Sequence, residues 1–151
     1  MRKTLSVAAI QNGTVIDHIP AGQALKIIAL LRINQQDAQL TLGLNLPSAS
    51  RRAKDILKLE GRYLTPQEAN EITIFAPNAT INIIKNFKVM EKITTTMPGF
   101  IDEVLQCPNM RCITRVEPIK TYFYVEKHRD NVHLQCKYCE RTFAREELGV
   151  L

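Results

Sequence analysis

Four cysteines in the last third of the chain constrain its fold more than any other feature. Cys107 and Cys112 form a C-x4-C pair, and after 23 intervening residues Cys136 and Cys139 form a C-x2-C pair. Two tight turns that each supply two thiolates, joined by a β-hairpin, are typical of a tetrahedral zinc site. Because four thiolates saturate the metal, the spacing predicts one structural zinc ion per chain and no coordination position left for catalysis.

Other uses of the thiols fit less well. A redox C-x-x-C motif needs one pair and gives no role to Cys107 and Cys112. Disulfides need an oxidising compartment, and the start of the chain, MRKTLSVAAI, lacks the long apolar region and the small-residue cleavage site of a secretory signal. The longest apolar run, Ile27–Leu31, is too short to span a bilayer. We therefore expect a cytoplasmic protein with metal-bound thiols and no membrane partner.

Charge is distributed unevenly along the chain. The net charge is +5. Residues 1–100 hold 12 Lys and Arg against 7 Asp and Glu, whereas residues 101–151 hold 8 of each. A zinc tetrathiolate would add two negative charges to the second segment. A site for an anionic ligand is therefore expected in the first segment.

The segment Thr94–Gly99 separates two domains. It has no hydrophobic periodicity and ends in a Pro-Gly turn signal. The length of 151 residues allows two small domains, which we place at 1–97 and 98–151. The second is too short to bury a self-sufficient core, so a metal staple is expected there.

The first domain alternates between the periodicities of strands and helices. Strands are expected at Leu5–Ile10, at Thr14–Ile16 after an Asn12-Gly13 turn, and at Gln39–Leu46, Asp55–Glu60 and Ala79–Met90. One helix is expected with Pro20 in its first turn and Leu25, Ile28 and Leu31 in the core, and a second from the capping box Thr65-Pro66-Gln67-Glu68 to about Phe75. The order βαββαβ predicts a ferredoxin-like α+β fold with two helices on one face of an antiparallel sheet.

The second domain contains only strand patterns. Tyr122–Val125 and Val132–Leu134 flank a polar turn, and Phe143 marks a short third strand. Together with the cysteine pairs, these patterns predict a small all-β domain of the zinc-ribbon type.

The order of several sequence strings points to a known family. GTVIDHIPAG, LTLGLNLPS, KDILKLE and APNATINII are followed, across the linker, by CPNMRC and CKYCERTF. In this order they resemble the regulatory chains of aspartate carbamoyltransferase, nearly from end to end. The resemblance implies a non-catalytic subunit in pyrimidine biosynthesis. Its first domain would bind the effectors CTP, ATP and UTP and form a regulatory homodimer, and its zinc domain would contact a separate catalytic chain.

The resemblance also implies roles for individual residues. The nucleotide-binding residues would be Val7, Ala8, Ile10, Asp17, His18, Lys58, Asn82, Ile84, Phe87, Val89 and Lys92. Asp17 would accept hydrogen bonds from the ribose, while His18 and Lys92 would lie toward the phosphates. The best-known members have an acidic residue at the position of Ala8 and tyrosine at that of Phe87, so effector selectivity stays open. Asn109 and Glu140, in the two cysteine turns, would contact the catalytic chain.

The same residues also allow interpretations without a nucleotide-binding role, and other functions were considered. Strand lysines such as Lys58 and Lys92 are usually only solvated, and Asp17-His18 before a helix would more often cap it. A nucleic-acid-binding zinc ribbon is suggested by the pI of about 9.1, but the zinc segment is neutral, so no nucleic-acid partner is expected. A small ferredoxin-like hydrolase is disfavoured, because no Ser/His/Asp, Cys/His or paired-carboxylate motif is present.

Overall fold

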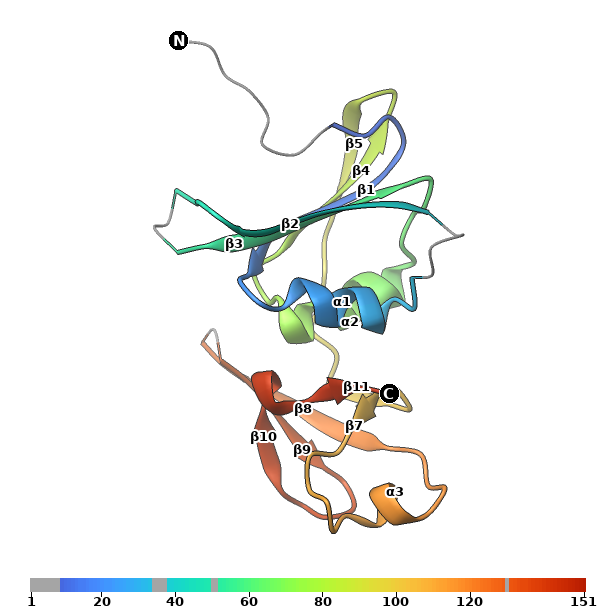
Figure 1. The fold of residues 1–151 in the computed structure, drawn as a ribbon, viewed down its shortest axis with the longest axis vertical. Helices are drawn as coiled ribbons and strands as arrows, with labels where there is room; N and C mark the ends of the chain where they lie inside the picture. The colour runs from blue at the N-terminus through green and yellow to red at the C-terminus, as the bar shows by residue number, and fades with distance from the viewer. Residues whose placement is uncertain (1–8, 34–37, 50–51, 130) are drawn as a thin grey trace.

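Two domains follow one another along the chain in the computed structural model, which describes residues 9–33, 38–49, 52–129 and 131–151 (Figure 1). The first is a five-stranded sheet with α1 (Ala24–Leu30) and α2 (Pro66–Phe75) on one side. Both helices lie between this sheet and the second domain. Within the described ranges, no helix has the length and apolar character needed to cross a membrane.

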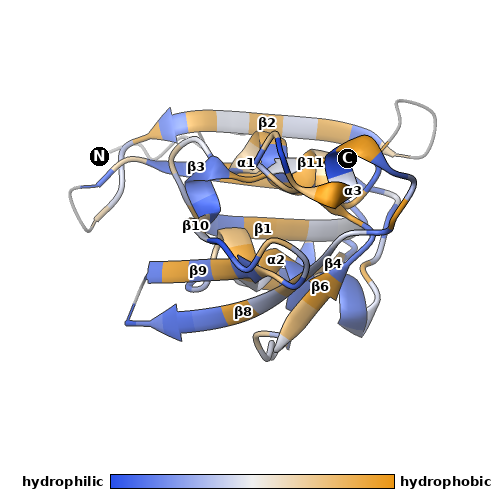
Figure 2. Ribbon diagram, turned by 90° about the horizontal axis from the view of Figure 1, so that it is seen from below, coloured by the Kyte–Doolittle hydropathy of each residue, from blue (hydrophilic) through white to orange (hydrophobic). Residues whose placement is uncertain are grey.

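The first sheet has the ferredoxin-like topology that the sequence predicts. Its strands are β1 (Gly13–Pro20), β2 (Gln39–Leu46), β3 (Lys54–Glu60), β4 (Thr80–Lys85) and β5 (Lys88–Ile93), in the order β2-β3-β1-β4-β5. All neighbouring strands pair antiparallel. Leucines alternate with polar residues or glycine along β2, whose bounds match the prediction (Figure 2). The extra strand, β5, extends the βαββαβ order beyond the ferredoxin-like core.

The prediction of a single last strand at Ala79–Met90 is wrong. β4 and β5 form a hairpin in which Lys85 pairs with Lys88 across a two-residue loop. Asn86 and Phe87 have φ values of 51° and 64°, as a type I′ turn requires. This turn lacks the glycine by which such turns are usually recognised, which explains the error.

The prediction that Pro20 opens a helix is also wrong. Pro20 ends β1 and pairs with Lys54, and α1 begins at Ala24. A bulge after Ile16, at which His18 has a φ of 60°, lets β1 continue to the proline. Asp17 and His18 therefore lie within a strand and cap no helix. The predicted strand at Leu5–Ile10 falls largely outside the described residues, and its last two positions lie in no strand.

The two helices begin differently. α2 has the predicted capping box: the Thr65 hydroxyl accepts from the backbone N–H of Glu68, and the Glu68 carboxylate accepts from that of Thr65. α1 has no side-chain cap at Gln23. Instead, the buried carboxylate of Asp55 on β3 accepts from the backbone N–H of Ala24, the first residue of α1, and from that of Gly22, just before the helix.

The core lies between the helices and the sheet. Ile16, Leu57 and Ile81 lie side by side on the face that the helices cover, and all are fully buried. In α1 the buried residues are Ala24, Ile27 and Leu30, whereas the predicted core residue Leu25 is 59% exposed. Among the residues that the structure describes, no helix covers the opposite face of the sheet (Figure 1).

The second domain is all-β apart from single helical turns. β6 (Phe100–Asp102), β8 (Tyr122–His128), β9 (Asn131–Cys136) and β10 (Thr142–Ala144) form a sheet in the order β10-β9-β8-β6. The predicted strands at 122–125, 132–134 and 143 are confirmed within β8, β9 and β10. The sequence did not predict β6 or the pairing of β7 (Leu105–Gln106) with β11 (Gly149–Val150). The helical turns are α3 (Ile113–Val116) and η1 (Arg145–Glu147).

A four-cysteine metal centre and a candidate ligand-binding face

The four cysteines come together at one end of the second domain. Cys107 follows β7, Cys112 precedes α3, Cys136 ends β9, and Cys139 lies in the next turn. All four Sγ atoms lie within 4.8 Å of one another, and both Cys107–Cys139 and Cys112–Cys136 are 3.7 Å apart. In a tetrahedral site with Zn–S bonds of about 2.3 Å, sulfur atoms lie about 3.8 Å apart. The thiols therefore fit one structural zinc ion, as the spacing predicts.

The turns around the centre are held by their own hydrogen bonds. The backbone N–H of Cys112 donates to the carbonyl of Asn109 at 3.0 Å, and that of Glu140 donates to the carbonyl of Cys136 at 2.9 Å. The Arg115 guanidinium donates to the carbonyl of Cys107 at 2.9 Å. These hydrogen bonds hold the turns that carry the four ligands.

Proton affinity differs among three of the thiols, those of Cys107, Cys136 and Cys139. Burial raises the pKa of both Cys107 and Cys136. At Cys139 burial also opposes ionisation, but hydrogen bonding, first from the backbone of Arg141, outweighs it and lowers the pKa to about 7. Zinc binds thiolates, so loading the site at neutral pH releases the protons held by the more basic thiols.

Exposed apolar side chains surround the cysteine turns. Met110, Ile113, Val116 and Tyr138 are 69%, 46%, 70% and 42% exposed. They belong to the same turns as Asn109 and Glu140, the residues that the sequence singled out, and to α3. We call these four residues the metal-side patch. Sequence reasoning missed them because apolar residues in a small domain are first assigned to the core.

The helix-free face of the first sheet carries one row of side chains across all five strands. The register pairs Thr41 with Lys58, Lys58 with Val15, Val15 with Asn82, and Asn82 with Lys92. Paired residues point to the same face of a sheet. Three of the predicted nucleotide-binding residues, Lys58, Asn82 and Lys92, therefore share one face.

A cavity of about 220 Å³ lies over this row. Its lining includes six of the predicted nucleotide-binding residues: Ile10, Lys58, Asn82, Ile84, Phe87 and Val89. A hollow of about 250 Å³ shares Ala9, Ile10 and Phe87 with it. We call the 220 Å³ cavity the sheet-face cavity. Its walls are mostly apolar, and its polar side chains are one amide and one amine.

Lys58 is the buried cation of the sheet-face cavity, with 8% of its surface exposed. Burial lowers the pKa of its ammonium group, although the nearby Asp17 carboxylate acts in the opposite direction. An anionic or strongly hydrogen-bonding ligand group would therefore gain from contact with this ammonium, because little water competes for it.

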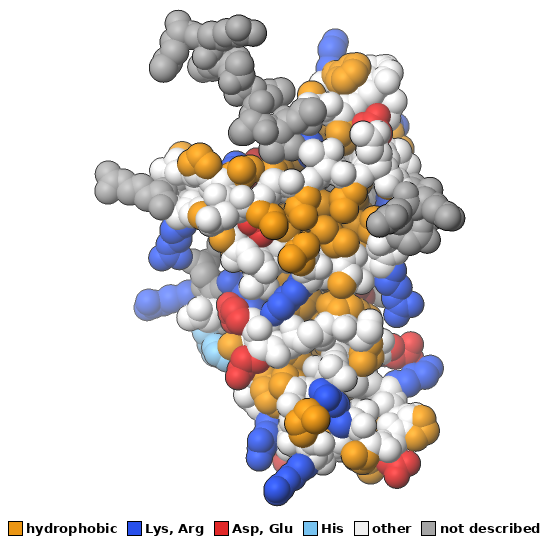
Figure 3. Space-filling view, in the orientation of Figure 1, with side chains coloured by type: hydrophobic (Ala, Val, Ile, Leu, Met, Phe, Trp, Pro, Cys, Tyr) orange, Lys and Arg blue, Asp and Glu red, His pale blue; other side chains and the backbone are white. Residues whose placement is uncertain are grey.

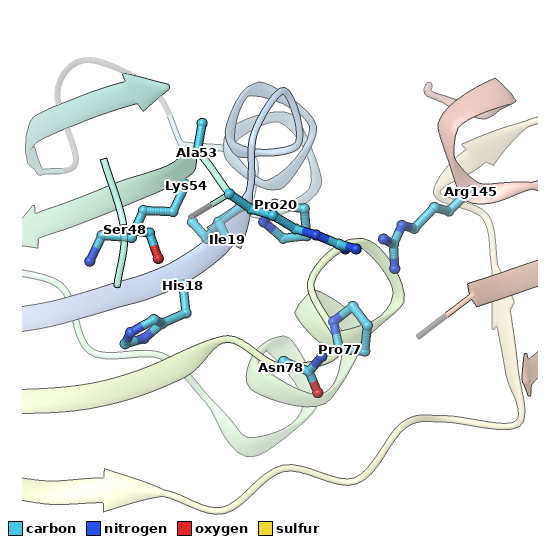
Figure 4. Close-up of a pocket in the computed structure, with 10 residues that line it drawn as sticks. His18, Ile19, Pro20, Ser48, Ala53, Lys54, Pro77, Asn78 and Arg145 are labelled. Carbon is cyan, nitrogen blue, oxygen red and sulfur yellow. The ribbon is translucent and has the colours of Figure 1, made fainter. Parts of the chain in front are cut away.

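The remaining predicted residues lie apart from the sheet-face cavity. Asp17 pairs with Lys54 at 2.9 Å. His18 places its Nδ1 3.1 Å from the Thr80 hydroxyl and lines a second pocket (Figure 4). Lys92 is exposed beside Asn82. Val7 and Ala8 lie outside the described residues.

Sequence reasoning missed the basic residues of that second pocket. Arg52 and Lys54 line it with His18, and Arg145 joins them from the second domain. The run Arg51-Arg52-Ala53-Lys54 was a signal in the sequence, but it resembles an ordinary solvated loop. No signal connected residues so far apart as 52 and 145.

Comparisons with known proteins match both domains. A family model described as "Aspartate carbamoyltransferase regulatory chain, allosteric domain" matches residues 5–96, and one described as "Aspartate carbamoyltransferase regulatory chain, metal binding domain" matches residues 100–149. The chain is 49% identical over 142 residues to the aspartate carbamoyltransferase regulatory chain of Sodalis glossinidius, covering 94% of this chain and 92% of that protein. It is 45% identical over 142 residues to that of Aliivibrio fischeri, with the same coverage. The corresponding protein of Chromobacterium violaceum is 43% identical over 146 residues, 97% of this chain and 96% of that protein.

Proposed function

The chain belongs to the family of aspartate carbamoyltransferase regulatory chains, which makes it a non-catalytic subunit with an allosteric domain and a metal-binding domain, and from this we propose that it binds CTP, ATP and UTP on the helix-free face of its first sheet. The sheet-face cavity supports this proposal most strongly. Six residues that the family resemblance singled out line one cavity, although they come from four separate segments of the chain.

The chemistry of the cavity suits a base and ribose. Ile84 and Val89 offer apolar contacts, and Phe87 offers a ring at the tip of the β4–β5 hairpin. The Asn82 amide can both donate to and accept from a base edge, since it carries both kinds of group. Lys58 would donate to ribose or base oxygens. The family resemblance also implies nucleotide contacts from Val7 and Ala8, which lie outside the described residues.

The phosphates would lie outside the sheet-face cavity, toward Lys92 and His18. Lys92 follows Asn82 in the same row, and His18 lies beyond Asp17 on β1. Lysine provides a mobile positive charge for phosphate oxygens. Asp17 would accept from ribose hydroxyls while retaining Lys54 as its partner.

The second domain would supply the contact with the catalytic chain. Asn109 and Glu140 lie within the turns that the metal holds, and the metal-side patch adds exposed apolar surface of the kind that protein interfaces bury. We place the nucleotide-binding domain at residues 1–97, with homodimerisation through it, and the partner-binding domain at residues 98–151. The cytoplasmic location stays a prediction.

Calorimetric titration with each nucleotide tests the nucleotide proposal. The full zinc-loaded chain should bind CTP, and Phe87→Ala and Asn82→Ala should each weaken binding by about tenfold, because each removes one wall of the cavity. Lys127→Gln, a charge change on an exposed strand residue of the other domain, should leave affinity unchanged. Equal affinity for wild type and both cavity variants would refute the site.

A further inference from the structure

The pocket between the two domains is larger than the sheet-face cavity and is lined by both halves of the chain. Its volume is about 480 Å³. The first domain contributes the end of β1, the loop before β3 and the loop after α2, and the second contributes Arg145 (Figure 4). The ten residues that line it are His18, Ile19, Pro20, Ser48, Arg52, Ala53, Lys54, Pro77, Asn78 and Arg145. We call it the junction pocket.

The lining of the junction pocket is strongly basic. Arg52, Lys54 and Arg145 are basic side chains, His18 adds an imidazole ring, and no lining residue is acidic. Two carboxylates outside the lining pair with these cations: Asp17 lies 2.9 Å from the Lys54 ammonium, and Glu146 lies 3.1 Å from Nε of Arg145. Figure 3 shows Lys and Arg side chains on both flanks at the level where the domains meet. A concave surface of this charge concentrates anions.

The backbone of Arg145 is attached to the first domain. The Lys26 ammonium, on α1, donates to the carbonyls of Arg145 and Glu146 at 3.0 and 2.8 Å. The same ammonium lies 5.6 Å from the centre of the Phe75 ring on α2. Burial lowers the pKa of this lysine, but the two backbone carbonyls accept hydrogen bonds from its ammonium group in place of water. Arg145 is therefore held at the pocket by its main chain, while its side chain lines the wall.

We propose that the junction pocket binds a polyphosphate anion between the domains, with Arg145 as the contact from the second domain, and that binding tightens the attachment of η1 to α1. The anion is either the phosphate tail of a bound nucleotide, in which case the inference rests on the function proposed above, or a free polyphosphate. In both cases the guanidinium groups of Arg52 and Arg145 would donate to phosphate oxygens. Binding of the anion to the first domain would thereby directly affect the metal-binding domain, through Arg145.

Binding measurements with two probes test the assignment of the pocket. Inorganic tripolyphosphate and CTP are titrated separately into the zinc-loaded full chain and into Arg145→Gln and Arg52→Gln, with Lys127→Gln as the charge-matched control. Each pocket variant should bind tripolyphosphate, CTP or both about tenfold more weakly than wild type, the size expected for the loss of one charge-assisted contact. The control variant should bind both probes as tightly as wild type does. If only CTP binding is weakened, the anion is the phosphate tail of the nucleotide. If the binding of both probes is weakened, the pocket is a general polyphosphate site.

The outcomes separate this inference from the nucleotide proposal. If Phe87→Ala weakens CTP but both arginine variants bind both probes like wild type, the junction pocket is refuted and the nucleotide site stands. If wild type binds tripolyphosphate in an Arg145-dependent way but no nucleotide, the nucleotide proposal fails and the junction pocket stands.

Hydrogen exchange tests the coupling between the domains. The backbone N–H of Leu148 donates to the Arg145 carbonyl, so its exchange reports on η1. Saturating tripolyphosphate should slow exchange at residues 145–148 severalfold in wild type. Lys26→Met should abolish this slowing while retaining most of the affinity, because it removes the attachment and leaves the pocket cations. Unchanged exchange in saturated wild type would overturn the coupling.

Discussion

The Asp55 carboxylate, on β3, accepts a hydrogen bond of 3.2 Å from the backbone N–H of Ala24, the first residue of α1. The same side chain accepts from Gly22 and, through its other oxygen, from Asn45. One buried acidic residue thus fixes the start of a helix and the bulge of an edge strand.

Replacing Asp55 should strongly destabilise the first domain. Asp55→Ala leaves three backbone N–H groups without their acceptor, so we expect a loss of about 3 kcal/mol in the free energy of unfolding. Denaturant unfolding followed by far-UV circular dichroism measures it. Glu126→Gln, on an exposed strand of the other domain, is the control and should change stability by less than about 0.5 kcal/mol. A loss of similar size in both variants would contradict the role of Asp55.

Gly13 should not tolerate a side chain. Its φ is 147°, and a Cβ atom there would lie 1.8 Å from the carbonyl oxygen of Leu59. Gly13→Ala should therefore cost about 2–3 kcal/mol of stability, since a backbone atom must move. At Gly99 an added Cβ meets nothing within 4 Å, so Gly99→Ala is the matched control. Equal thermal midpoints for the two variants would show that β1 and β3 can separate without cost.

Removal of zinc should unfold the second domain first. Elemental analysis should find one zinc per chain, and a thiol-reactive mercurial should release it with loss of structure at residues 101–151, because the small core lacks its staple. Residues 1–93 should stay largely protected from hydrogen exchange and retain nucleotide binding. In the complex with the catalytic chain, the catalytic chains should separate from this chain, remain active and stop responding to nucleotides. Intact complexes after complete zinc loss would contradict the partner assignment.

The zinc affinity should fall as the pH falls. The pKa values of Cys107 and Cys136 are raised by burial, so protons compete with the metal for these thiols already at neutral pH. Competition with a chromogenic chelator between pH 8 and pH 6 measures the affinity. An affinity that does not depend on pH would mean that the thiols are ionised before zinc arrives.

The capping box of α2 should make stability depend on pH in the acid range. Although burial opposes it, hydrogen bonding to Thr65 and Arg62 lowers the pKa of Glu68 below its usual 4.5. Because the folded state binds this proton less tightly, the stabilisation is present above about pH 4.5 and is lost as the pH falls through the lower folded value. Glu68→Gln should cost about 1 kcal/mol at pH 7 and progressively less below pH 4.5. The unfolding midpoints of both proteins, compared at each pH, measure this.

The sequence correctly predicted those elements that local residue patterns determine without help from tertiary contacts. Strict alternation specifies β2, the capping box specifies α2, and the cysteine spacing specifies the metal centre. Asn86-Phe87 and Pro20 misled the prediction because tertiary contacts hold them: the Phe87 N–H donates to the carbonyl of Gln11, and Pro20 pairs across a bulge. The junction pocket could not be predicted, since nothing local relates Arg52 to Arg145.

The row from Thr41 to Lys92 has a consequence for the order of folding. Its five side chains come from five strands and share a face only when all four strand pairings have their native register, since a slip of one residue turns a side chain to the other face. Some of these pairings join residues far apart in the chain, and such contacts form slowly. During refolding, the helices and hairpins will therefore form before the row does. Ligand binding will recover only when the last pair of strands has reached its native register.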